Sequence, residues 1–277
     1  MWLRSLTRKS LYDQRWQIAG FGICMFMIAA LDVFIWPAYK DQLALIEIPP
    51  ALEGLIGDMP LNTGAGFLNA EYFSWIILLL LVFAVIQGTG AIAGEESAGT
   101  ADLLLAQPLS RTELVAAKML AALAGAIAIV MMGVLGFAIS IPFVEIDVSV
   151  WDTFVASVNM LFVTFLFYGL SLWLGAVAPT RAAAAGGAIA VLVAAYFIDL
   201  MAASVEALDW LRYLSPFYYY GRGLPLVNGI NWWHAALLTG IGAALCALAV
   251  RTFNRRDVTV GGATSMPLRE LVRRLAG

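Results

Sequence analysis

The sequence has few charged residues and few of the residue types that build soluble catalytic sites. Only 13% of the 277 residues are charged and 62% are hydrophobic, against about 25% charged and 45–50% apolar in a soluble domain. The one histidine is His234, and the two cysteines, Cys24 and Cys246, lie within apolar runs, which favours packing over a disulfide or metal site. These shortages exclude a soluble globular domain and indicate a chain that lies in lipid.

Motifs for nucleotide binding and hydrolysis are also missing. The sequence has no G-x-x-x-x-G-K-[ST] loop to hold nucleotide phosphates and no H-E-x-x-H or G-x-S-x-G motif. The net charge of −3, with no basic stripe, gives no basis for nucleic-acid binding. We therefore expect no enzyme activity in this chain, and no metal ion or other cofactor of its own.

Long apolar runs are what the sequence does contain. A membrane-spanning helix needs about 20 mostly apolar residues, and six segments reach that length. They are 17–36, 72–93, 115–141, 153–177, 182–203 and 232–251. Backbone groups in hydrocarbon must be satisfied within a helix or a closed barrel, and alternating ten-residue strands are absent. We predict an all-α membrane protein with six transmembrane helices in one transmembrane domain, 1–277.

The basic residues predict how the spans are oriented. Cytoplasmic loops retain Lys and Arg near the helix ends. With six spans and a cytoplasmic N-terminus, 13 of the 16 basic residues lie inside, and only Lys40, Arg212 and Arg222 lie outside. We therefore predict that both the N- and the C-terminus are cytoplasmic, and that the chain is a multi-pass protein of a cell membrane.

Three segments outside the spans carry further expectations. Residues 1–16 alternate Trp and Leu with Arg and Lys, a composition typical of a helix lying in the inner headgroup layer. The outer segment 204–231 is apolar but interrupted by Pro and Gly, which predicts short re-entrant helices. Residues 252–277 form a cytoplasmic tail. Aromatic residues at the span ends, such as Trp36, Tyr72, Trp75, Trp151 and Trp232, are expected at the membrane interfaces.

Polar residues inside a membrane are functional candidates by default, because burying them is costly. Those of this chain that could line a pathway are Gln87, Asn159, Asp199 and Tyr218. Other interpretations stay open: Gln87 and Asn159 could hydrogen-bond to neighbouring helices, Asp199 and Asp32 could be hydrated near the outer surface, and Tyr218 could be an interfacial anchor. No chain of charges typical of a proton relay is present, which argues against an ion-driven transporter.

The cytoplasmic segment 94–112, between the second and third spans, has the most ordered pattern of residues. Glu95 and Glu96 precede Gly99-Thr100, an apolar run follows, and Pro108 breaks it. Ser110 and Glu113 then form an S-x-x-E capping box, which predicts the start of the third span. The pattern predicts a short amphipathic helix along the membrane face.

At these positions the chain resembles the permeases of the ABC exporters that move drugs, lipids and polysaccharides, the type V exporter fold. The matching spacing is E-x-x-x-G-T-x-x-x-L-x-x-x-P-x-S-R with Lys118 seven residues on. The resemblance implies that 94–112 is a coupling helix that docks on a separate ATPase. The coupling positions that it implies are Glu95, Glu96, Gly99, Thr100, Pro108 and Arg111.

The resemblance also implies the partners of the chain. They are ATP-binding cassette ATPase subunits, which bind ATP and Mg, and a second permease subunit, identical or related, in a bacterial or archaeal inner membrane. The implied function is export of an apolar or amphipathic substrate. Two alternatives stay open: a permease-like subunit that transmits ATPase work to an extracytoplasmic partner without carrying cargo, and an ATP-independent carrier, channel or membrane enzyme.

Overall fold

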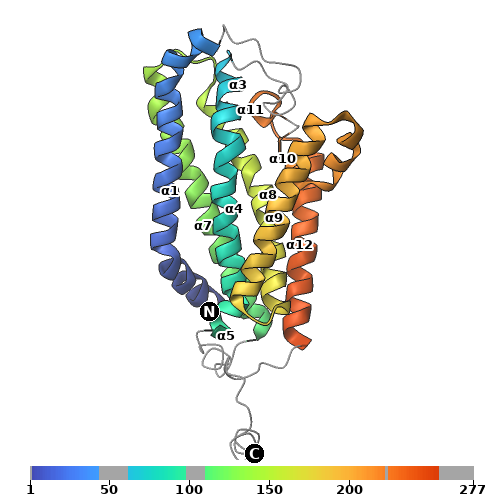
Figure 1. Cartoon of the computed structure of the whole chain (residues 1–277). Helices are drawn as coiled ribbons and strands as arrows, with labels where there is room; N and C mark the ends of the chain where they lie inside the picture. The colour runs from blue at the N-terminus through green and yellow to red at the C-terminus, as the bar shows by residue number, and fades with distance from the viewer. Residues whose placement is uncertain (1, 44–61, 98–109, 222–223, 256–277) are drawn as a thin grey trace, which may run out of the picture.

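The computed structural model describes residues 2–43, 62–97, 110–221 and 224–255, and these form helices without a strand. Within these residues, six helices or helical runs are long and apolar enough to cross a membrane, as predicted. They are α1 (Trp2–Leu43), a run over Gly64–Gly94, α7 (Arg111–Ser140) with the 3-10 turn η3 (Ile141–Phe143), α8 (Val150–Val177), α9 (Arg181–Ser204) and α12 (Trp232–Arg255). The end of α12 lies at the same end of the bundle as the N-terminus (Figure 1).

The second span is longer than the predicted 72–93. It begins with α3 (Gly64–Leu68) and the π-helical turn η1 (Asn69–Phe73), continues as α4 (Ser74–Thr89), and ends with a second π-helical turn, η2 (Gly90–Gly94), and α5 (Glu95–Ser97). The side chain of Thr63 starts the run by accepting a hydrogen bond of 3.0 Å from the Gly66 amide. Each π turn interrupts the regular i→i−4 hydrogen bonding. The helical run therefore reaches beyond the apolar stretch at both ends.

Residues 1–16 do not form a separate helix. From Trp2 onward they are the first part of α1, which runs unbroken to Leu43. The reason is local: the first glycine is Gly20 and the one proline inside α1 is Pro37, so nothing near residue 16 stops the helix. The N-terminal part of α1 bends away from the long axis of the bundle (Figure 1). Its position in the headgroup layer stays a prediction.

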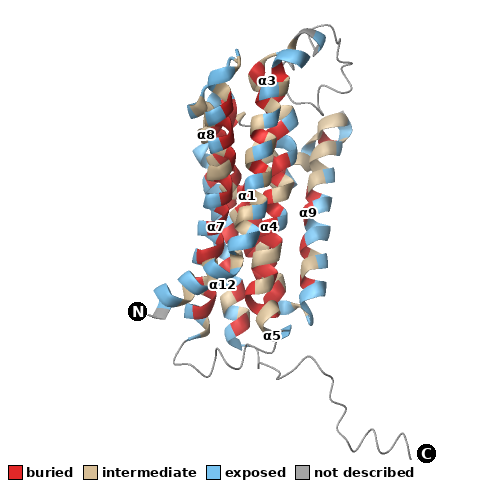
Figure 2. Cartoon of the chain, turned by 90° about the vertical axis from the view of Figure 1, so that its left-hand side faces the viewer, coloured by how far each residue is buried: buried red, intermediate tan, exposed pale blue. Residues whose placement is uncertain are grey.

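The centre of the bundle is formed by α4 and α8. In an apolar 18-residue stretch of the second span, Gly64–Gly94, 67% of the residues are buried, and in one of α8 61% are, against 22% in both α1 and α9. Helix α1 packs along α7, and α12 packs along α8. Exposed residues run along the outer faces of α1 and α9 (Figure 2). These outer faces are apolar, with Ile23, Met27, Ile189 and Val193 among the exposed side chains, as a lipid-facing surface requires.

Short helices connect α9 to α12, as predicted for 204–231. They are the 3-10 helix η4 (Glu206–Leu214), α10 (Pro216–Gly221) and α11 (Pro225–Asn228), and α10 and α11 lie at the end of the bundle away from α5 (Figure 1). The Ser215 hydroxyl donates to the Ala195 carbonyl at 2.8 Å, and the Tyr220 hydroxyl donates to the Phe73 carbonyl at 2.9 Å. These bonds fix the segment to the bundle, whereas its entry into the bilayer stays a prediction.

Two of the aromatic residues expected at a membrane interface are instead inside the protein. Trp36 is 4% exposed and Tyr72 is 0% exposed, whereas Trp75, Trp151 and Trp232 are 60% or more exposed. The indole of Trp36 donates to the Glu145 carbonyl at 3.2 Å. Trp36 is covered because α3 and the α7–α8 connection extend past the predicted span ends and pack on it, whereas Tyr72 packs against Phe137 of α7 inside the bundle.

Candidate functional site

The predicted coupling segment is described only at its two flanks. On one side the described residues end with α5 (Glu95–Ser97), and on the other they resume at Ser110. Helix α5 lies at the end of the bundle that carries the N-terminus (Figure 1). The predicted coupling residues Gly99, Thr100 and Pro108 lie outside the described residues, as does the side chain of Glu96. Of the predicted coupling side chains, the structure therefore places Glu95 and Arg111.

The capping box at the start of α7 is confirmed. The Ser110 hydroxyl accepts from the Glu113 amide at 3.2 Å, and the Ser110 amide donates to the Glu113 carboxylate at 2.9 Å. Two amide groups at the helix start are satisfied in this way. The start of the third span is thus fixed where the predicted coupling segment ends.

Glu95 forms an ion pair with Lys118 of α7. The side chains are 25% and 16% exposed respectively, so water screens this pair less than a surface pair. Sequence reasoning placed Lys118 in the motif but missed its partner. The available signal was a lysine two turns inside an apolar span, because such a charge needs an acid nearby. The pair joins the end of the second span to the third.

Arg111 joins the start of α7 to the end of α12. Its guanidinium donates to the Phe253 carbonyl at 2.6 Å and lies 5.2 Å from the centre of the Phe253 ring. Next to it, the Asn254 side-chain amide donates to the Thr112 hydroxyl at 3.3 Å. Together with the Glu95–Lys118 pair, these contacts connect both flanks of the coupling segment to three spans. Docking of Glu95 or Arg111 on an ATPase stays a prediction.

Gln87 and Asn159 each hydrogen-bond to a neighbouring element, which was one of the two interpretations of these residues. The Gln87 amide donates to the Gln17 side chain at 2.5 Å and so links α4 to α1. Asn159 is 5% exposed, and its amide donates to the Tyr220 carbonyl at 3.0 Å, linking α8 to α10.

Tyr218 belongs to an aromatic cluster on α10 and its surroundings. Its ring centre lies 5.0 Å from that of Tyr213 and 6.1 Å from that of His234. A hydrogen bond from Arg212 lowers the pKa of Tyr213.

Asp199 lies half-buried on α9. Since Gln87 lies near η2 and Tyr218 on α10, the four predicted pathway residues do not come together within one subunit.

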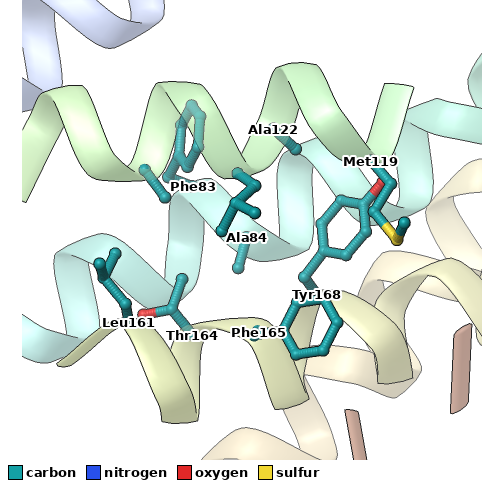
Figure 3. A pocket seen from close by; sticks show the side chains of 10 residues that line it. Phe83, Ala84, Met119, Ala122, Leu161, Thr164, Phe165 and Tyr168 are labelled. Atoms are coloured by element: carbon teal, nitrogen blue, oxygen red, sulfur yellow. The ribbon is translucent and has the colours of Figure 1, made fainter. Parts of the chain in front are cut away.

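An apolar pocket lies between α4, α7 and α8 and is too small for cargo. Figure 3 shows its lining, which includes Phe83, Met119, Thr164 and Tyr168. Its volume is about 20 Å³, and a single water needs roughly 10–15 Å³ of such space. The Tyr168 hydroxyl is buried and has no hydrogen-bond partner among the described residues. The lining exposes only apolar surface, and a buried water needs two to four polar partners, so the pocket is a small packing void rather than a binding site.

A much larger cavity lies at the α5 end of the bundle, between α1, η2, α7 and α9. Its volume is about 540 Å³, within the range of about 300–1,000 Å³ of small-molecule sites. Its charged lining residues are Lys9, Asp13, Glu95, Lys118 and Arg181. The amides of Gln14, Gln17 and Gln87 also line it. Sequence reasoning missed this cavity, because its walls come from four distant segments.

The comparisons with known proteins agree with the architecture. The model of the family described as "ABC-2 family transporter protein" matches residues 15–258. This range contains all six spans apart from the first part of α1. A comparison with the curated proteins finds no match.

Proposed function

The chain belongs to the ABC-2 family of transporter proteins and is a multi-pass membrane permease, and we propose that it exports an apolar or amphipathic substrate. The family implies an ATP-binding cassette ATPase as partner. In this proposal, separate ATPase subunits bind ATP and Mg, and a second permease subunit, identical or related, completes the pathway. The described part of the chain contributes the spans and both flanks of the coupling segment.

The observation that carries the proposal is the set of contacts at these flanks. Glu95 contacts Lys118, and Arg111 contacts Phe253, so movement of the segment 94–112 pulls on the second, third and sixth spans together. A rigid connection of this kind is what an ATPase needs to move a membrane domain. Binding of ATP would close the ATPase pair, and the two coupling segments would move with it.

A second candidate is a permease that transmits ATPase work to an extracytoplasmic partner without carrying cargo. The observation that favours it is the dense packing between α4, α7 and α8, where the apolar pocket holds only about 20 Å³. Under our proposal the cargo instead passes between two permease subunits.

Reconstitution with the candidate ATPase tests the two functions. We expect vesicles that contain the full chain and the ATPase to move a fluorescent lipid analogue only when hydrolysable ATP is present. An ATPase variant that binds but does not hydrolyse ATP is the control and gives no transport. Stimulated ATPase activity without transport would favour the second candidate, and undiminished transport without the ATPase would contradict both.

The proposal requires the α5 end of the bundle to face the cytoplasm, which cysteine labelling measures. The test uses a chain in which Cys24 and Cys246 are replaced by alanine. A membrane-impermeant maleimide added to intact cells should label Phe143→Cys, because Phe143 is 77% exposed and lies in the connection between α7 and α8, at the end of the bundle away from α5. It should label Ser5→Cys, an exposed position at the other end, only after permeabilisation. Labelling of Ser5→Cys in intact cells would show that the N-terminal end faces outward, which contradicts the proposal.

A further inference from the structure

Two cationic side chains that line the 540 Å³ cavity are not neutralised by any residue that the structure describes. Among the described residues, neither Lys9 nor Arg181 has an acidic partner, although Glu95 neutralises Lys118 in the same cavity. Arg181 makes one long contact, from its guanidinium to the Ile86 carbonyl at 3.5 Å. Asp13 is the remaining charged group in the lining. Among the described lining residues, two cations without an acidic partner against one carboxylate give the cavity a net positive charge.

The backbone around Arg181 leaves room for its guanidinium. A Cβ atom at Gly90 would lie 3.2 Å from the guanidinium, and one at Gly94 would lie 3.8 Å from the Arg181 side chain. Because neither glycine has a side chain, the guanidinium of Arg181 can lie close to the backbone of η2. Arg181 is also the first residue of α9, where the partial positive charge of the helix start adds to its own.

An unpartnered amide oxygen lies in the same cavity. The side-chain oxygen of Gln14 is buried and has no hydrogen-bond partner among the residues described. Buried polar atoms normally have a partner, either in the protein or in a ligand or water. A negatively charged ligand would satisfy Arg181 and Lys9, and a hydroxyl group on it would reach the Gln14 oxygen once that buried side chain turns toward the cavity.

The position of the cavity favours a lipid as the source of that ligand. The cavity lies where α1 leaves the bundle, and the same part of α1 exposes Tyr12 and Trp16, at 62% and 75%. Arginine and exposed aromatic residues are typical of the headgroup level of a membrane. With this part of α1 in the headgroup layer, as predicted, the cavity would open toward the phosphates of one leaflet.

We propose that this cavity binds the phosphate of an anionic phospholipid as a resident ligand, with Lys9 and Arg181 as its cationic partners. Arginine and lysine form charge-assisted hydrogen bonds to phosphate oxygens. The headgroup hydroxyl of a lipid such as phosphatidylglycerol would donate to Gln14 once that side chain turns toward the cavity. Assignment to the cytoplasmic leaflet depends on the proposed orientation, whereas the binding itself depends on neither orientation nor transport.

Native mass spectrometry of the purified full chain tests the proposal with three probes. These are dioctanoyl phosphatidylglycerol, dioctanoyl phosphatidylcholine and inorganic phosphate. We expect the chain to bind phosphatidylglycerol more tightly than phosphatidylcholine, and inorganic phosphate not to displace it at equal concentration. Displacement by inorganic phosphate at equal concentration would overturn the lipid as the source.

Two variants and a matched control connect the binding to the cavity. We expect Arg181→Gln and Lys9→Gln each to lower the affinity for phosphatidylglycerol about tenfold, because each removes a charge-assisted hydrogen bond. Arg251→Gln removes an exposed arginine of α12 that does not line the cavity, and it should leave the affinity unchanged. The thermal midpoint of each variant without lipid reports whether it is folded. Equal affinities in folded Arg181→Gln, folded Lys9→Gln and the unchanged chain would overturn the proposal.

Discussion

Replacement of Glu95 and Glu96 by lysine is expected to weaken the coupling of the ATPase to the permease about tenfold. If the segment 94–112 docks on the ATPase, its acidic side chains meet basic residues of the ATPase. The double substitution Glu95→Lys/Glu96→Lys would then place two lysines against those basic residues. Coupling free energies between sites commonly correspond to 5–150-fold effects, and we expect stimulation of the ATPase to fall about tenfold. The measurement is the ATPase rate of the complex with and without the permease, at matched insertion.

The Glu95–Lys118 pair requires a control, because Glu95→Lys also places two lysines together inside the protein. The exchange Glu95→Lys/Lys118→Glu restores an ion pair between the same positions while leaving the acid at position 95 absent. If Glu95 acts by docking, this exchange keeps near-normal thermal stability yet couples poorly. Recovery of full coupling in the exchange variant would show that Glu95 acts through Lys118, and the docking role of Glu95 would be wrong.

The six spans could be predicted from the sequence because lipid imposes a simple requirement. Every spanning segment must be apolar for about 20 residues and must satisfy its own backbone. The predicted 153–177 and 182–203 accordingly lie within α8 (Val150–Val177) and α9 (Arg181–Ser204). The start of α7 was predictable as well, since Ser110 and Glu113 satisfy the first amides of the helix locally.

Features that depend on contacts between distant segments could not be predicted. Trp36 was expected in the interface because its sequence position is the end of an apolar run, and it is buried because residues more than a hundred positions later cover it. The partners of Glu95 and Arg111 lie 23 and 142 positions away in the sequence. Lys118 inside an apolar span signals that an acid lies nearby, but no periodicity identifies Glu95 as that acid or pairs Arg111 with Phe253.

The crossing of α8 and α12 is expected to tolerate no added methyl group. A Cβ atom on Gly169 would lie 2.5 Å from the Gly242 carbonyl oxygen, and one on Gly242 would lie 3.1 Å from the Leu166 backbone. Backbone atoms of two packed helices have no room to move without separating the helices, and overpacking of this kind costs about 1–3 kcal/mol. We expect Gly242→Ala to lower the midpoint of thermal unfolding in detergent by about 5 °C.

Gly240 provides a matched control on the same helix. It lies two residues before Gly242, and a Cβ atom there would meet nothing within 4 Å. Alanine favours a helix over glycine by up to about 1 kcal/mol, so Gly240→Ala should keep or slightly raise the midpoint. The two substitutions add the same atoms to the same helix, and only the side of α12 that receives them differs. Equal midpoints for both variants would mean that α8 and α12 do not approach as closely as Gly169 and Gly242 permit, and the packing that holds the sixth span against the centre of the bundle would have to be different.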